Sequence, residues 1–170
     1  MSVFKRYELQ FFTATILEWK KLLQPNKYKE IIINSLRFLV NERRVIIHGF
    51  VIMDNHLHLV WNTLHPHQKS DVQRDFLKFT AQMIKFDLIE NHPKVLEAFC
   101  VNAKDRKYQF WERNPLSIDI FTEVVLIQKL GYVHENPVKT GLVSMTTDYH
   151  YSSARFYESG IDEFGFLTAY

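Results

Sequence analysis

The sequence predicts an α+β fold in which helices pack against one antiparallel sheet. Apolar residues recur at spacings of three and four in residues 25–43 and 70–90, which is the pattern of amphipathic helices. Runs rich in β-branched and aromatic residues predict strands at 7–17, 44–53, 56–62 and 107–113. The resulting order, strand–helix–strand–strand–helix–strand, is the ferredoxin-like (split βαβ) arrangement, with two helices on one face of the sheet.

Boundary residues support these elements in turn. Pro25 suits the first turn of the first helix because its φ angle is already helical. Asp54-Asn55 has turn chemistry, so the second and third strands are expected to form a hairpin. Ser70 can cap the second helix, and residues 91–106 are expected to be an irregular connection.

One further helix is predicted at about residues 120–135, beyond the ferredoxin-like order. Asp119 can cap its N-terminus. Asn136-Pro137 is expected to end it, since proline cannot continue a helix and Asn136 alone is typical of a C-terminal cap.

Composition indicates one globular domain over residues 1–170. Hydrophobic residues make up 46% of the 170 residues and aromatic residues 15%, which excludes a disordered chain. There is no apolar run of the roughly 18 residues that a membrane span needs, and no signal peptide is recognisable. The single cysteine, Cys100, excludes an internal disulfide and fits a reducing, cytoplasmic environment.

Charge is unevenly distributed along the chain. Residues 20–44 contain seven basic and two acidic residues, whereas the last 30 residues contain one basic and four acidic residues, with an acidic tail from about residue 158. This asymmetry fits an anionic partner, and it equally fits a solvated helix face.

The segment 55–61, NHLHLVW, contains the first candidate site. Alternation along a strand places His56 and His58 on one face, roughly 7 Å apart, and Leu57, Leu59 and Trp61 on the other. Two imidazoles so placed can bind one divalent cation, or they can be two solvated strand residues. A second pair, His65 and His67, lies in a predicted loop and lacks a strand to fix both rings.

The last predicted helix has two residues that such a site would need. Tyr132 and Asn136 lie one turn apart, on the same side of the helix. Tyr132 is about 120° from the apolar stripe of this helix, so the core does not require it, although a tyrosine near a helix end often packs its ring and exposes its hydroxyl. The scattered glycines exclude a phosphate-binding loop, and neither a serine elbow nor an H-E-x-x-H motif is present.

Three segments together resemble a known family. MDNHLHLVW, LGYVHENPVKTGLV and YHYSSARFY, in this order, resemble the single-tyrosine HUH transposases, especially the REP-associated tyrosine transposases and related small insertion-sequence transposases. By this resemblance His56 and His58 are the metal-binding pair, Tyr132 is the nucleophile and Asn136 completes the metal site. The chain departs from the family at Asp54, where the usual residue is proline, and the departure is expected to leave the ligands intact.

The resemblance implies a metal-dependent, single-stranded DNA nicking and joining enzyme that acts near DNA hairpins through a 5′-phosphotyrosine. The cofactor would be Mg²⁺ or Mn²⁺, and both monomer and homodimer remain open. A hairpin-DNA binding protein without catalysis and a water-using metal phosphodiesterase are the alternatives. Candidate DNA contacts are Arg43, Arg44, Lys139 and Trp111.

Overall fold

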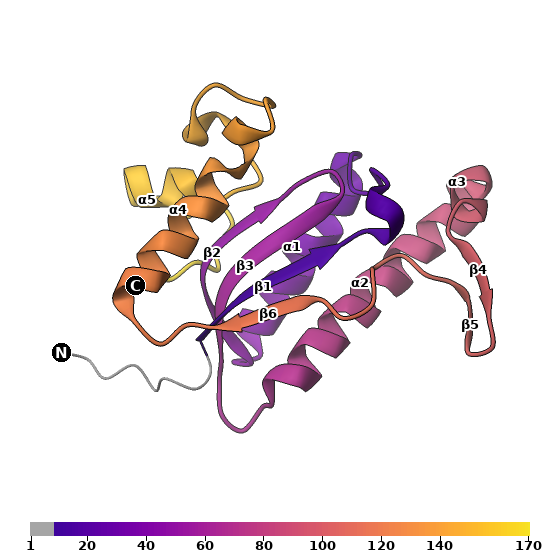
Figure 1. Ribbon diagram of the computed structural model, residues 1–170, viewed down its shortest axis with the longest axis horizontal. Helices are drawn as coiled ribbons and strands as arrows, with labels where there is room; N and C mark the ends of the chain where they lie inside the picture. The colour runs from indigo at the N-terminus through magenta and orange to yellow at the C-terminus, as the bar shows by residue number, and fades with distance from the viewer. Residues whose placement is uncertain (1–8) are drawn as a thin grey trace.

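The computed structural model describes residues 9–170, so residues 7 and 8 of the first predicted strand lie outside the described part. Its main feature is a four-stranded antiparallel sheet in the order β2-β3-β1-β6 (Figure 1). The strands are β1 (Leu9–Thr15), β2 (Val45–Ile52), β3 (His56–Thr63) and β6 (Leu116–Asp119). This strand order confirms the ferredoxin-like arrangement.

Two helices, α1 (Asn26–Asn41) and α2 (Lys69–Asn91), cover one face of the sheet (Figure 1). The larger hydrophobic core lies beneath them and contains Leu57, Leu59 and Trp61, all fully buried. The predicted alternation of β3 is therefore confirmed, because its histidines point to the other face. None of the helices within residues 9–170 is long and apolar enough to cross a bilayer.

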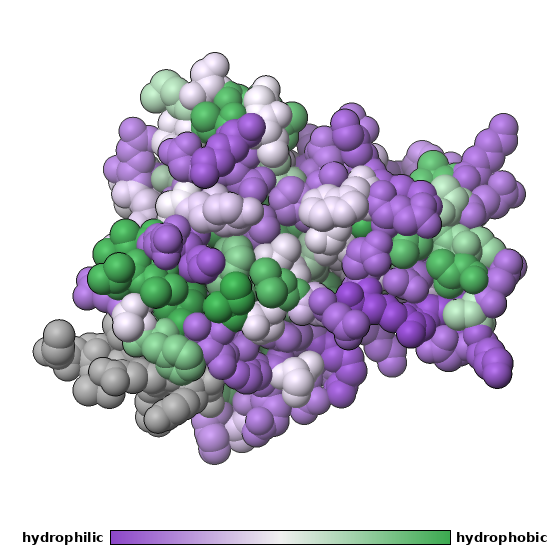
Figure 2. All heavy atoms as spheres, in the orientation of Figure 1, coloured by the Kyte–Doolittle hydropathy of each residue, from purple (hydrophilic) through white to green (hydrophobic). Residues whose placement is uncertain are grey.

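The helix α4 (Glu123–Lys139) covers part of the opposite face, where a smaller apolar cluster forms. Leu126, Leu130 and Val133 of α4 are buried in this cluster. Gly49 of β2 allows the close approach, because a Cβ atom at this position would collide with the Leu130 side chain. Hydrophobic side chains also gather on the outer surface near the start of α4 (Figure 2), where Phe121, Val124 and Ile127 are exposed.

The termini of α4 differ from the prediction. Thr122 is the N-cap, and its hydroxyl accepts a hydrogen bond from the amide of Val125. Asp119 instead pairs with Lys69 at 2.8 Å. The helix continues through Pro137 to Lys139, so Asn136 is an internal helical residue and not a C-terminal cap. Pro137 lies in the last turn, where only one backbone hydrogen bond is lost to it.

The region between α2 and α4 also differs from the prediction. Residues 91–106 are not irregular: they contain α3 (Pro93–Glu97) and β4 (Cys100–Ala103), which pairs with β5 (Arg106–Tyr108) as a separate hairpin. The predicted strand 107–113 is not the fourth strand of the main sheet. That position is taken by β6, a short edge strand whose four residues carry too little alternation to be recognised.

The turn between β2 and β3 is fixed by a buried ion pair. The Lys29 ammonium lies 3.0 Å from the carboxylate of Asp54, and the lysine side chain is only 4% exposed. The same ammonium donates to the carbonyl oxygens of Leu23 and Gln24. Asp54 therefore anchors the hairpin turn to α1.

The acidic tail is part of the folded domain. After α5 (Ala154–Ser159), Phe164 and Phe166 are buried against Phe50. The amide of Thr168 donates to the carbonyl of Ile47 at 2.9 Å. The tail thus covers an edge of β2, which its acidic composition does not suggest.

Candidate active site

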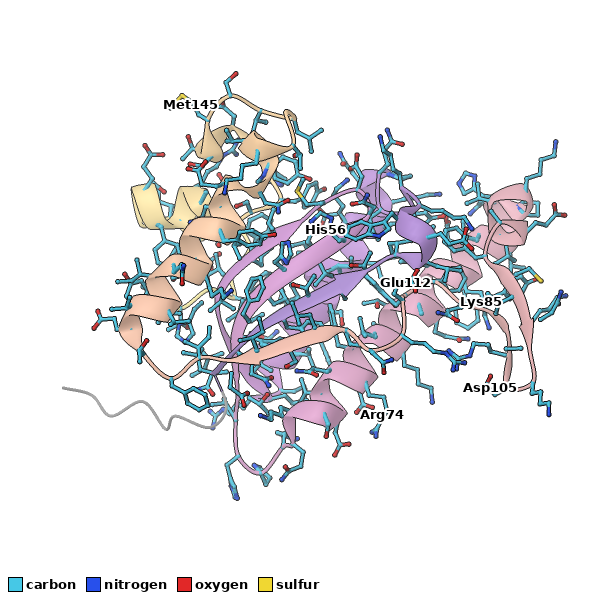
Figure 3. All side chains as sticks on the ribbon, in the orientation of Figure 1. His56, Arg74, Lys85, Asp105, Glu112 and Met145 are labelled. Atoms are coloured by element: carbon cyan, nitrogen blue, oxygen red, sulfur yellow. The ribbon has the colours of Figure 1, made fainter. Side chains whose placement is uncertain are left out.

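A cleft of about 470 Å³ lies between α4 and the sheet face that carries the two histidines. Figure 3 shows His56 at the end of β3 that adjoins the β2–β3 turn. Strand β3 contributes the imidazoles, α4 contributes polar side chains, and β1 and β6 form the floor. The cleft is lined by Phe11, Thr13, Trp19, His56, His58, Leu116, Ile118, Lys129, Tyr132 and Asn136.

The two imidazoles lie side by side, with ring centroids 4.9 Å apart. Each has a neighbour at its Nδ1 atom: the Thr13 hydroxyl lies 2.7 Å from Nδ1 of His58, and Oδ1 of Asn55 lies 2.7 Å from Nδ1 of His56. With the proton held on Nδ1, each Nε2 keeps a lone pair. Such outer partners set the tautomer and orientation of metal-binding histidines.

Burial keeps both rings neutral. It lowers the pKa of His56, and it is the main cause that lowers the pKa of His58 to about 3, followed by the charges of His56 and Lys129. Both histidines are therefore in the neutral form at physiological pH, which is the form that ligates a metal.

Helix α4 brings Tyr132 and Asn136 to the histidines. The centroids of the Tyr132 and His58 rings are 5.2 Å apart, and Tyr132 is 44% exposed, so the residue borders both the cleft and the solvent. Nδ2 of Asn136 lies 3.4 Å from Nε2 of His58. The structure thus brings together the four residues that the sequence and its resemblance singled out, although 74 positions separate His58 from Tyr132 in the chain.

The donors present fit a divalent cation. Oδ1 of Asn136 is one of three buried side-chain polar atoms without a hydrogen-bond partner in residues 9–170, and of the three it alone belongs to a residue that lines the cleft. Two imidazole nitrogens and one amide oxygen suit Mn²⁺ better than Mg²⁺ by ligand type. Within residues 9–170 no three His, Cys, Asp or Glu side chains converge, so the amide is the third protein donor available here.

Sequence reasoning missed Lys129, which lines the cleft one turn before Tyr132. Its ammonium lies 4.8 Å from the centroid of the Phe11 ring. Lys139, which was predicted as a phosphate contact, lies 5.8 Å above the Tyr132 ring. Cationic side chains therefore lie on both sides of the tyrosine along the helix. The sequence signal that could have found Lys129 is its spacing of three residues from Tyr132, which places both side chains on the same side of a helix.

The other predicted DNA contacts lie apart from the cleft. Arg44 precedes β2, and its backbone carbonyl accepts a hydrogen bond from the amide of Leu64, just beyond the far end of β3. With Arg43 it is therefore one strand length, roughly 25 Å, from His56. Trp111 is 6% exposed, and its indole N–H donates to Thr80 at 3.2 Å, so it has no free face for a base.

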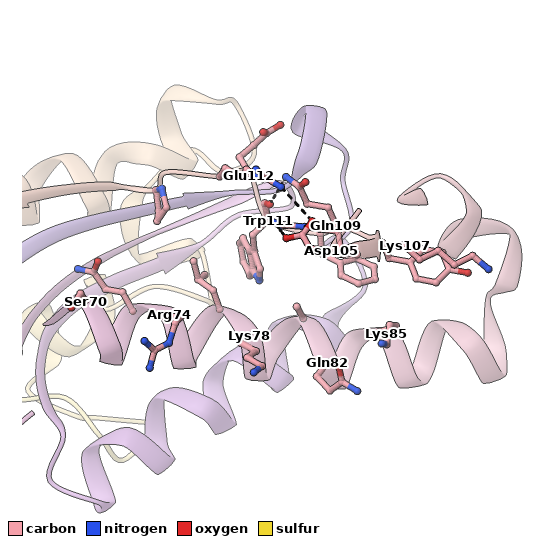
Figure 4. Close-up of a pocket in the computed structure, with 18 residues that line it drawn as sticks. Ser70, Arg74, Lys78, Gln82, Lys85, Asp105, Lys107, Gln109, Trp111 and Glu112 are labelled. Atoms are coloured by element: carbon pink, nitrogen blue, oxygen red, sulfur yellow. Dashed lines mark hydrogen bonds and ion pairs between the residues drawn. The ribbon is translucent and has the colours of Figure 1, made fainter. Parts of the chain in front are cut away.

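A larger cavity of about 810 Å³ lies between α2 and residues 105–115 (Figure 4). Its arginines are largely paired: Arg74 contacts Asp71 and Asp75, and Arg106 contacts Asp105. No histidine is among the described residues that line it. This cavity therefore lacks the histidine pair that distinguishes the smaller cleft.

Comparison with known proteins identifies the fold. No family model matches the sequence, and no curated protein matches it. A REP-associated tyrosine transposase solved with a bound REP hairpin is similar over 100% of this chain and 95% of that chain, with 19% sequence identity and a TM-score of 0.69. A protein from Deinococcus radiodurans R1 that is described as a transposase is similar over 76% of this chain and 91% of that chain, with 12% sequence identity and a TM-score of 0.48. The chain shares its fold with the REP-associated tyrosine transposase.

Proposed function

We propose that this protein is a transposase of the single-tyrosine HUH type, a metal-dependent enzyme that cuts and joins single-stranded DNA near hairpins. The observation that carries the proposal is the meeting of Tyr132 with His56, His58 and Asn136 in one cleft of one chain. The shared fold supports it, since the similar transposase was solved with a hairpin bound.

Tyr132 is the proposed nucleophile. Its phenolic oxygen attacks the phosphorus of the scissile phosphate, forming a 5′-phosphotyrosine, while the bond to the 3′ oxygen breaks. The phenolic proton leaves to solvent or to the departing 3′ oxygen, which becomes a hydroxyl. Attack by a 3′-hydroxyl on the phosphotyrosine reverses these changes and joins strands, so no nucleotide cofactor is consumed.

The neighbouring residues bind and orient the phosphate. His56, His58 and Asn136 would hold the divalent cation, which when bound supplies charge neutralisation at the phosphate. Lys129 and Lys139 place positive charge on either side of Tyr132, where they can attract the phosphate and stabilise the phenolate. Phe11, which belongs to the smaller apolar cluster, supplies an apolar part of the cleft lining.

The test is formation of a covalent adduct. The protein is incubated with Mn²⁺ or Mg²⁺ and a labelled single-stranded oligonucleotide that carries a hairpin, and denaturing electrophoresis is used to detect a protein–DNA adduct. We expect an adduct that disappears in Tyr132→Phe and persists in Tyr170→Phe, a matched control because Tyr170 is equally exposed.

Two results would contradict the covalent mechanism. Cleavage that persists in Tyr132→Phe would indicate a phosphodiesterase that uses water as the nucleophile. Hairpin binding without cleavage in the wild-type protein, with either metal, would indicate a DNA-binding protein that lacks catalysis.

A further inference from the structure

Trp19 is an exposed aromatic side chain at the mouth of the cleft. It ends a short 3-10 turn, Leu17–Trp19, that follows β1, and it is 61% exposed. Its ring lies edge-on to His56, with centroids 5.8 Å apart. The other two tryptophans, Trp61 and Trp111, are buried. Trp19 is therefore the tryptophan whose ring is available to an external ligand, and it is the one that lines the cleft.

The backbone holds Trp19 outward at an energetic cost. Glu18 and Trp19 have φ angles of 55° and 57°, in the left-handed region that disfavours residues other than glycine. The turn is secured on both sides: Leu17 donates its amide to Phe110 at 2.8 Å, and the Glu18 amide donates to the Glu112 carboxylate at 2.6 Å. These two hydrogen bonds hold the turn in the conformation that exposes the indole to solvent.

A series of ring contacts connects Trp19 to the nucleophile. The distances between ring centroids are 5.8 Å from Trp19 to His56, 4.9 Å from His56 to His58 and 5.2 Å from His58 to Tyr132. This span is within the reach of a few nucleotides of an extended strand. Within the cleft the cationic side chain comes from α4, at Lys129, and the exposed indole comes from the turn after β1, so phosphates and bases would meet different elements.

We propose that Trp19 forms a nucleobase-binding subsite, on which one unpaired base next to the scissile phosphate stacks. This inference rests on the proposed function, because it takes single-stranded DNA as the ligand. An indole suits any base, since every base has a π-face. The subsite therefore holds the strand in position without selecting its sequence.

Binding is tested in Tyr132→Phe protein with Mn²⁺, so that cleavage does not interfere. A hairpin oligonucleotide is scanned with a single abasic site at each unpaired position, and affinity is measured by fluorescence anisotropy. We expect one position at which base removal weakens binding about 5- to 150-fold, the range of one lost stacking contact. Adding Trp19→Ala should abolish the dependence on that position, whereas Trp19→Phe should retain it.

Tryptophan fluorescence gives a second readout. Because Trp61 and Trp111 are buried, quenching by acrylamide reports chiefly on Trp19. The unmodified oligonucleotide should protect this fluorescence, and the oligonucleotide that is abasic at the sensitive position should protect it less. Circular dichroism of the Trp19 variants checks that they are folded.

Several outcomes would overturn the subsite. These are an abasic profile that Trp19→Ala leaves unchanged, unaltered quenching when DNA binds, or protection that rises with protein concentration without DNA, which would assign Trp19 to self-association. Failure of the proposed function would be seen in a different experiment, as the absence of a Tyr132 adduct in the wild-type protein. The binding measurements on Trp19 would be unaffected by that result.

Discussion

At the scale of single residues, Oδ1 of Asn136 is the unpartnered side-chain polar atom that belongs to a residue of the cleft. It is buried without a hydrogen bond, while Nδ2 of the same side chain approaches His58. A buried, unsatisfied acceptor costs roughly 1–3 kcal/mol. A cation bound at this atom would offset the cost and bind the folded state only.

The first prediction is therefore a metal-dependent gain in thermal stability without DNA. Mn²⁺ at 100 times its dissociation constant should stabilise the wild-type protein by about 2.7 kcal/mol. Asn136→Ala should abolish most of this gain, and Asn136→Asp should retain it and improve the response to Mg²⁺, because a carboxylate is the harder ligand. Differential scanning calorimetry measures the shift, with Asn91→Ala, an exposed asparagine, as the control. Equal stabilisation of Asn136→Ala and wild-type protein would exclude Asn136 as a ligand.

At the scale of elements, the position of α4 determines whether the site exists. Leu130 of α4 occupies the space that a side chain at position 49 of β2 would fill. The contact lies in the smaller cluster, which is what holds α4 against the sheet.

The second prediction concerns this contact. Gly49→Ala should destabilise the protein by about 1–3 kcal/mol, the usual cost of overpacking, and should reduce adduct formation by shifting Tyr132. Leu130→Val in the same chain should restore part of both losses by making room. Urea unfolding and adduct assays on the two single variants and the double variant measure the coupling. If the losses of the two single variants simply add in the double variant, the contact between positions 49 and 130 does not determine the position of α4.

The tail offers a prediction about pH. His48 lies in β2, and its Nδ1 donates to the carbonyl of Thr168 at 2.9 Å. Burial lowers the pKa of this histidine below its usual 6.5, so the folded state favours the neutral ring. The resulting stability is complete above pH 6.5 and is lost as the pH falls below it, because the unfolded chain takes up the proton more readily.

The third prediction is that His48→Gln reduces the acid sensitivity of folding. Glutamine keeps an N–H donor for Thr168 but does not titrate. The difference in unfolding free energy between pH 7.5 and pH 5, measured in urea, should therefore be smaller in the variant. Part of the dependence will remain, because burial also lowers the pKa of His56, of His58 to about 3 and of His134 to about 4. An unchanged pH profile would contradict a role for His48.

At the scale of the whole molecule, one chain contains a complete candidate site. The tyrosine of α4 and the histidines of β3 meet within the same chain, with Tyr132 and His58 in ring contact. Exchange of α4 between copies is not needed to build this cleft.

The fourth prediction follows from this arrangement. A mixture of Tyr132→Phe protein with protein carrying both His56→Ala and His58→Ala should form no DNA adduct, because neither copy has both halves of the site. The adduct assay on the mixture measures this, with each variant mixed with wild-type protein as the control. Adduct formation by the two defective proteins together would show that active sites are shared between copies.

How far the sequence predicts this molecule depends on the length of each pattern. The alternation in β3 was sufficient to place both histidines on one face, and the spacing of Tyr132 and Asn136 placed both on one side of α4. The short edge strand β6 was missed because four residues contain too few alternations. Lys129 and Trp19 were missed because their roles depend on which helix and which turn border the cleft, which only the tertiary structure determines.

The ion pair at the β2–β3 turn constrains the order in which mutations can accumulate. Replacing Asp54 by proline would leave the ammonium of Lys29 buried without a counter-charge, at a cost of about 3–5 kcal/mol. Replacing Lys29 by methionine first would leave a carboxylate that is 23% exposed and still reached by water. A lineage in which position 54 passes from aspartate to proline is therefore expected to change position 29 first, and a lineage that passes the other way is expected to change position 54 first.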